Sequence, residues 1–262
     1  MGYKKNLSYK AFLKSKFKSI KHSTYFDVYD ELFTKYRNKK ITFVEIGVLS
    51  GGSLFMWRNF FGPKARIIGI DLNPQAKKWA KHGFEIYIGD QSDINFWKKF
   101  KKKVGLIDII LDDGGHRYID QITSIECMLD NIKDNGIIVV EDTHTSYMNH
   151  FGNKKYSFIS YIKNKIDKIN QRSHRLNGKN PEMKIWSIKI YESIVAIFIN
   201  NRGKFEKSFQ IKNKGKDDKA IDFRVKKNKF NSNSNILKWI LNKLNIYRLE
   251  NKTNSIIKNY FK

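Results

Sequence analysis

Two short acidic clusters contain the side chains of this sequence that are best suited to chemistry. Each follows an apolar run, at residues 107–111 and 136–140, and together they comprise Asp112, Asp113, His116, Glu141 and Asp142. Carboxylates that point into one cleft repel one another unless a cation or a shared proton lies between them. Oxygen donors favour a hard divalent ion, most simply Mg²⁺, with Mn²⁺ or Fe²⁺ as alternatives. A solvated acidic rim without a metal ion is the other interpretation.

The elements that must position these clusters alternate along the chain. Five short apolar runs predict β-strands at residues 41–46, 66–71, 84–88, 107–111 and 136–140, with helices predicted between them at 54–61, 75–81, 94–101 and 118–129. Such alternation is typical of a doubly wound parallel sheet. Two further runs, 185–191 and 194–199, predict an antiparallel hairpin that closes the sheet. The predicted fold class is therefore α/β, Rossmann-like and mostly parallel, with basic helical extensions at both ends.

Glycines and polar residues also follow the other predicted strands, at the edge where such sheets bind ligands. A glycine-containing segment after the first strand would let the chain turn tightly and approach a ligand closely, and its candidate cofactor contacts are Glu45, Gly47 and Ser53. Asp71, after the second strand, is placed to accept both hydroxyls of a ribose. Asp90 and Gln91, after the third strand, could bond the edge of an adenine. Since no phosphate-binding lysine motif is present, we expect a nucleoside rather than a nucleoside triphosphate.

The glycine segment, the acid at 71 and the acid–amide pair at 90 and 91 resemble the class I S-adenosylmethionine-dependent methyltransferases over residues 41–200. The motifs Asp-Asp-Gly-x-His and Glu-Asp-Thr-x-Thr-Ser-Tyr, which begin at Asp112 and Glu141, resemble the metal-dependent macrolide sugar O-methyltransferases and the related cephalosporin-hydroxylase-like family more closely. Another Rossmann-like enzyme, such as a dehydrogenase, is the alternative interpretation.

This resemblance implies roles for individual residues. The metal carboxylates of the family fall on Asp113, Glu141 and Asp142, its histidine base falls on His116, and Asp112 would lie near the amino-acid portion of S-adenosylmethionine. Gly115 departs from the family pattern, which often has serine there. The first 40 residues also differ, because the macrolide enzymes have a longer partner domain that helps to enclose the substrate.

The implied reaction is S-adenosylmethionine-dependent and divalent-metal-dependent methylation of a sugar hydroxyl. Two vicinal acceptor oxygens would chelate the cation, which lowers the pKa of the reacting hydroxyl. His116 would then accept the proton, because imidazole titrates near neutral pH; a structural surface histidine is the alternative. The expected acceptor is a small anionic molecule, a nucleotide-linked or lipid-linked sugar of a bacterial surface polysaccharide.

The charge distribution suits an anionic partner but does not define it. The formal net charge is +26 over 262 residues, yet residues 41–150 carry 13 basic and 14 acidic side chains. Residues 1–40 and 151–262 therefore carry all of the excess positive charge. A basic surface attracts phosphates, nucleic acid or an anionic membrane; compositional drift is the alternative.

Nucleic acid is not the expected partner. Amino-methylases of bases usually carry an Asn/Asp-Pro-Pro-aromatic motif after the fourth strand, where this chain has the acids and glycines of 112–115. Carbon methylation of pyrimidines needs a cysteine nucleophile, and the single Cys127 lies in a predicted helix. N-methylation of a small phosphorylated amine and a non-catalytic binding role stay open.

The sequence divides into three predicted parts. Residues 1–40 form a basic helical N-terminal element, 41–200 the S-adenosylmethionine-binding methyltransferase domain, and 201–262 a basic linker with an amphipathic helix at 236–247. That helix could contact its own domain, a second copy in a homo-oligomer, or the inner face of a membrane peripherally. We expect a cytoplasmic protein, because no apolar run is long enough for a membrane span and no secretory signal is recognisable.

Overall fold

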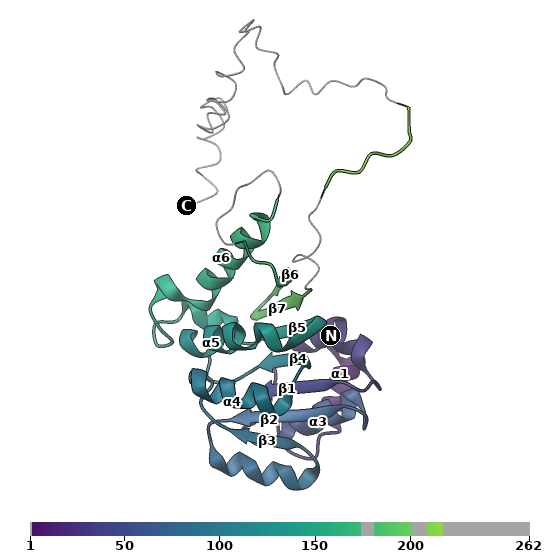
Figure 1. Cartoon of the computed structure of the whole chain (residues 1–262). Coiled ribbons are helices and arrows are strands. Elements are labelled where there is room, and N and C mark those ends of the chain that lie inside the picture. The colour runs from purple at the N-terminus through teal and green to yellow at the C-terminus, as the bar shows by residue number, and fades with distance from the viewer. Residues whose placement is uncertain (1, 174–180, 201–208, 217–262) are drawn as a thin grey trace, which may run out of the picture. The chain divides into compact units, whose positions relative to one another are not determined.

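A seven-stranded sheet organises the chain. The structure, a computed structural model, describes residues 2–173, 181–200 and 209–216. The strands are β1 (Thr42–Ile46), β2 (Arg66–Asp71), β3 (Glu85–Ile88), β4 (Ile107–Asp112), β5 (Ile132–Val140), β6 (Ile185–Tyr191) and β7 (Ile194–Ile199). Their order in the sheet is β3-β2-β1-β4-β5-β7-β6 (Figure 1).

Strands β1 to β5 run parallel, whereas β7 pairs antiparallel with both β5 and β6. The predicted Rossmann-like sheet with a terminal antiparallel hairpin is therefore confirmed. Ile46 at the end of β1 lies beside Asp112 of β4, and Asp112 lies beside Val140 of β5. The loops that carry the two acidic clusters consequently leave the sheet at one edge, next to each other.

Helices cover both faces of this sheet. They are α1 (Leu7–Leu13), α2 (Tyr25–Phe33), α3 (Gly52–Phe61), α4 (Ile94–Val104), α5 (Tyr118–Met128) and α6 (Phe158–Asn170), with 3₁₀ helices at Gly2–Lys5, Thr34–Tyr36, Pro74–His82, Leu129–Asn131, Thr143–Tyr147 and Lys154–Tyr156. On one face, α1, α2 and α3 pack around Phe43 and Trp57. On the other, α4, α5 and α6 pack around Val44 and Trp97. Neighbouring residues of β1 face opposite cores because side chains alternate along a strand.

The N-terminal element is helical only in part. The prediction of a helical element over residues 1–40 is wrong for residues 14–24, which connect α1 to α2 without helix and are called the strap from here on. Exposed lysines at 14, 16 and 18 alternate there with the half-buried Ser15 and Phe17. A period of two suits extended chain rather than helix, because alternate side chains then point to opposite sides.

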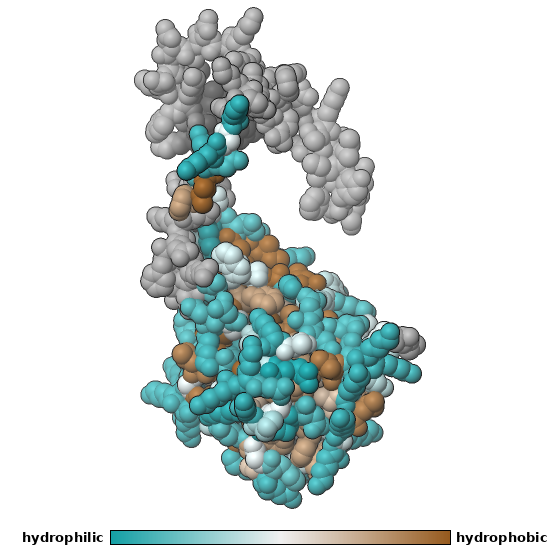
Figure 2. Space-filling model, turned by 90° about the vertical axis from the view of Figure 1, so that its right-hand side faces the viewer, coloured by the Kyte–Doolittle hydropathy of each residue, from teal (hydrophilic) through white to brown (hydrophobic). Residues whose placement is uncertain are grey.

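The strap, α1 and α2 belong to the same compact unit as the sheet, which spans Met1–Gln210. Hydrophilic side chains cover most of the face that Figure 2 shows of this unit, with apolar side chains confined to patches. None of the described helices is long and apolar enough to cross a bilayer.

The predicted C-terminal helix at 236–247, and all of the predicted linker except residues 209–216, lie outside the described residues. The membrane contact and the homo-oligomer that this helix suggested stay predictions.

Candidate active site

A cavity of about 710 Å³ opens at the edge of the sheet where the parallel strands end. Its wall contains six of the predicted site residues, namely Gly47, Asp71, Asp90, Gln91, Asp113 and His116. Ile20 of the strap also lines it. The volume lies within the range of roughly 300–1,000 Å³ that is typical of small-molecule sites.

Gly47 brings the loop after β1 against the loop after β4. Its φ of +88° is in the left-handed region, and a Cβ atom at this position would lie 2.0 Å from the carbonyl oxygen of Asp113. Only glycine tolerates both the conformation and the approach. The sequence prediction that this glycine permits close packing at the site agrees with the geometry.

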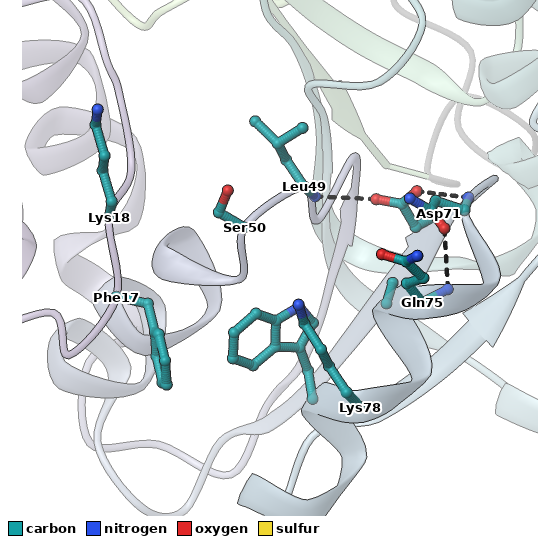
Figure 3. Close-up of a pocket in the computed structure, with 10 residues that line it drawn as sticks. Phe17, Lys18, Leu49, Ser50, Asp71, Gln75 and Lys78 are labelled. Carbon is teal, nitrogen blue, oxygen red and sulfur yellow. Dashed lines mark hydrogen bonds between the residues drawn. The ribbon is translucent and has the colours of Figure 1, made fainter.

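Asp71 is held in place by backbone donors. Its Oδ2 accepts hydrogen bonds from the amides of Val48 and Leu49, each at 2.9 Å, and its Oδ1 accepts one from the amide of Asn73 at 2.8 Å. Figure 3 shows Leu49 and Ser50 to the left of the Asp71 carboxylate and Gln75 below it. A second cavity, of about 520 Å³, shares Leu49 and Asp71 with the larger one, and Phe17 and Lys18 of the strap also line it (Figure 3).

Gln91 connects the loop after β3 to the first acidic cluster. Its Nε2 donates to both carboxylate oxygens of Asp112, at 3.1 and 3.2 Å, and its Oε1 accepts from the amide of Gly115 at 2.8 Å. Asp112 is buried and lines neither cavity, which corrects its predicted cofactor contact, and burial raises its pKa to about 6. Hydrogen bonds from the amide and hydroxyl of Ser92 lower the pKa of Asp90. Gln91 and Asp112 therefore hold the loop after β4 in place, whereas Asp90 lies on the cavity wall.

Glu45 and Ser53 do not line either cavity, which corrects their predicted cofactor contact. The Glu45 carboxylate is fully buried and accepts hydrogen bonds from Ser53 Oγ at 2.8 Å and Trp57 Nε1 at 2.9 Å. These bonds tie β1 to α3 within the core. Both residues hold the scaffold of the site together instead of contacting a ligand.

Burial raises the pKa of Glu45 from 4.5 to about 7, although Lys21, Trp57 and Ser53 lower it. The folded protein keeps a proton on Glu45 to a higher pH than the unfolded chain does. We therefore expect the contribution of Glu45 to the free energy of unfolding to fall between about pH 4.5 and pH 7. Urea unfolding of the wild type and of Glu45→Gln at several pH values measures it. The difference between the two proteins should change across that window, and a constant difference would contradict the assignment.

The structure brings the predicted base together with two of the predicted metal carboxylates. Asp113, His116 and Asp142 each offer one ligand atom, and these atoms lie within 4.8 Å of one another. His116 Nε2 is 3.5 Å from Asp142 Oδ2 and 4.0 Å from Asp113 Oδ1. His116 and Asp142 adopt left-handed backbone conformations, with φ of 56° and 53°. Strain of this kind concentrates at functional sites.

Glu141, the third predicted metal carboxylate, faces a lysine that the sequence analysis missed. Lys21 Nζ from the strap lies 2.5 Å from Asp113 Oδ2 and 2.9 Å from Glu141 Oε2, and its side chain is only 2% exposed. Burial alone would lower the pKa of Lys21, but the charges of Asp113 and Glu141 raise it above its ordinary value. The acidic cluster therefore already contains one buried positive charge.

Two tyrosines of α2 complete the surroundings of the acidic cluster. Tyr29 Oη donates to Glu141 Oε1 and Tyr25 Oη donates to Asp142 Oδ1, each at 2.5 Å. Burial raises the pKa of Glu141, against the lowering effect of Lys21. Tyr25 and Tyr29 are four residues apart on one helix and therefore share a helix face. This spacing is the signal in the sequence that could have identified them.

Comparison with known proteins agrees with this geometry. Residues 44–143 match a family described as a methyltransferase domain. Mycinamicin VI 2''-O-methyltransferase of Micromonospora griseorubida is 35% identical over 47% of this chain and 32% of its own length. A rhamnosyl-tetracenomycin C 2'-O-methyltransferase of Streptomyces olivaceus is 27% identical over 60% of this chain and 44% of its own. The chain thus spans less than half the length of these curated relatives.

A solved structure gives the same result. MycE methyltransferase from the mycinamycin pathway, in complex with Mg and SAH, superposes with a TM-score of 0.65 and 26% identity over 74% of this chain and 53% of the other. Residues 44–143 therefore match a methyltransferase domain, and over this region the chain is similar to O-methyltransferases, one of which was solved with Mg and SAH.

Proposed function

We propose that this protein transfers the methyl group of S-adenosylmethionine to a hydroxyl group of a sugar, with a divalent cation as cofactor. One observation carries the proposal: Asp113, His116 and Asp142 converge where the cavity lined by Gly47 and Asp71 ends. The site combines a nucleoside-sized cavity with a base and carboxylates beside it. The relatives that support this inference are named as O-methyltransferases, one of them of a rhamnosyl-bearing substrate, and one was solved with Mg, SAH and mycinamycin VI.

The cofactor would lie in the larger cavity. The Asp71 carboxylate, oriented by three backbone amides, would accept the ribose hydroxyls, and Asp90 would lie beside the adenine. Gly47 would allow the cofactor to approach the backbone. Asp112 and Gln91, by holding the loop after β4, would position Asp113 and His116 next to the sulfonium methyl group.

The donor set fits a divalent cation. Two carboxylates and an imidazole lie within 4.8 Å of one another, and the buried ammonium of Lys21 already neutralises part of the same cluster. Asp113 and Asp142 would hold the ion, and with Glu141 as the third ligand His116 would stay free to act as the base. When bound, the ion lowers the pKa of a coordinated acceptor hydroxyl.

The residues of the chain then supply proton transfer and orientation. His116 accepts the hydroxyl proton at Nε2, and the carboxylates of Asp142 and Asp113, 3.5 and 4.0 Å away, stabilise the imidazolium that forms. The oxygen attacks the methyl carbon in line, the carbon–sulfur bond breaks, and its electron pair stays on sulfur to give the neutral thioether. Positioning of the two reactants is the main contribution of the protein.

The finer identity of the acceptor is part of the proposal. We favour a nucleotide-linked or lipid-linked sugar of a surface polysaccharide, because the net charge of +26 and the lysines of the strap suit an anionic diphosphate. Calorimetry with S-adenosylmethionine, followed by a screen of sugar nucleotides with mass and NMR analysis of products, tests it. A methylated sugar product supports the proposal. Failure to bind S-adenosylmethionine would refute it, and transfer to RNA or to an amine alone would refute the acceptor class.

A further inference from the structure

The strap crosses the edge of the sheet at which the site lies. Ser15 Oγ donates to the carbonyl of Gly52 at 2.7 Å, and the ring of Phe17 lies 4.7 Å from Trp79 and 5.0 Å from Phe55, measured between centroids. Further along, Ile20 lines the larger cavity and Lys21 enters the acidic cluster. The strap is therefore anchored at one end by packing and at the other by an ion pair.

Gly52, at the start of α3, allows the strap to lie so close. A Cβ atom at this position would be 2.2 Å from the carbonyl oxygen of Lys18 and 2.5 Å from that of Phe17. These are backbone atoms, so a larger residue would displace the strap itself. The path that brings Lys21 to the acids is thus built into the first turn of α3.

Burying a lysine ammonium is unfavourable unless anionic partners compensate for its lost hydration. Lys21 Nζ has two such partners, Asp113 Oδ2 at 2.5 Å and Glu141 Oε2 at 2.9 Å. A divalent cation bound between Asp113 Oδ2 and Glu141 Oε2 would take the place of this ammonium. Since two cations within a few ångströms of each other repel strongly, the ammonium and the ion exclude each other there.

The alternative position for an ion has a consequence for the base. The grouped ligand atoms come from Asp113, His116 and Asp142, so an ion at this position would occupy the imidazole. Glu141 lies outside this group. An ion that took the place of the Lys21 ammonium would instead lie between Asp113 and Glu141, and Asp142, which is grouped with Asp113, would complete an all-carboxylate set. Only that second set leaves His116 Nε2 free to accept a proton.

We infer that Lys21 and the divalent cation compete for Asp113 and Glu141, so that metal binding releases the lysine end of the strap from the active site. This inference rests on the proposed function for the presence of the ion. The strap then covers the acidic cluster in the metal-free protein. It uncovers the cluster, next to Ile20 and the cofactor cavity, when the metal binds.

Titration calorimetry with MgCl₂ on the full chain tests the competition. Lys21→Met should bind Mg²⁺ at least about tenfold more tightly than the wild type, because the competing charge is gone. Lys14→Met is the matched control, since Lys14 is an exposed lysine of the same strap, and its affinity should equal that of the wild type. Equal affinity in Lys21→Met and the wild type, or no binding by either, would overturn the inference.

Limited trypsin digestion of the wild type gives a second readout, which decides the matter if Lys21→Met fails to fold. Saturating Mg²⁺ should accelerate cleavage after Lys21 several-fold, while cleavage after the exposed Lys212 and Lys214 serves as an internal reference. Unchanged or slower cleavage at Lys21 would overturn the inference. Affinity for S-adenosylmethionine, measured on the same samples, reports separately on the proposed function.

Discussion

Replacing Asp113 with asparagine should lower the rate of methyl transfer by on the order of 10³-fold or more, while affinity for S-adenosylmethionine changes little. Asp113 is the carboxylate that lies in the metal group, borders the cofactor cavity and bonds Lys21. The amide keeps the shape of the side chain but removes the charge that a divalent cation requires. Single-turnover rates and calorimetry with S-adenosylmethionine measure the two effects separately.

Removal of divalent metal with EDTA should produce the same loss, and added Mg²⁺ should restore the wild type but not Asp113→Asn. Asp167→Asn is a suitable control, because it changes the same chemical group at an exposed position on α6. Full turnover by Asp113→Asn, or by wild-type protein after exhaustive metal removal, would show that the reaction does not depend on a metal at this site.

Replacing His116 with asparagine should lower the single-turnover rate by about 10²–10⁴-fold, the range expected for loss of a general base. The pH–rate profile should also lose its acidic limb, because the group that must be deprotonated is gone. Asparagine is chosen since it tolerates the left-handed φ of 56° at this position better than alanine does.

His150→Asn, an exposed histidine, is the matched control and should keep both the rate and the pH profile. A purely structural role for His116 would reduce stability or cofactor affinity without changing the shape of the profile. An unchanged rate in His116→Asn would remove this residue as the base.

The fold was largely accessible from the sequence because each buried strand is a short apolar run with polar residues or glycine at its end. The limits of β2, β6 and β7 are those predicted, and β4 lies between β1 and β5. The helix α6 was not predicted, since residues 151–184 contain many polar residues. Its apolar side chains at 158, 162, 166 and 169 nevertheless recur at helical spacing.

The site was accessible only where motif residues follow strand ends. Asp71, Asp90 and Asp113 could be placed in this way, because the ends of parallel strands meet at one edge of the sheet. Lys21 could not, since it lies 92 residues from Asp113 and 120 from Glu141 along the chain, and nothing local distinguishes it from the other lysines. The cofactor contact predicted for Glu45 is wrong, because the sequence does not show whether an acid near a strand end faces a ligand or a buried tryptophan.

The aromatic packing beneath α2 determines which fragment of the chain is the shortest that could fold by itself. Tyr29 and Phe33 lie against Trp57, with ring centroids 5.0 and 5.6 Å apart, and β7 pairs with β5 along its length. A fragment trimmed to residues 44–143 would expose the Trp57 indole to solvent and leave one edge of β5 unpaired. Both changes promote aggregation. The smallest soluble piece should reach from α1 to β7. We therefore expect the aromatic core and the strap that covers the acidic cluster to fold as one unit.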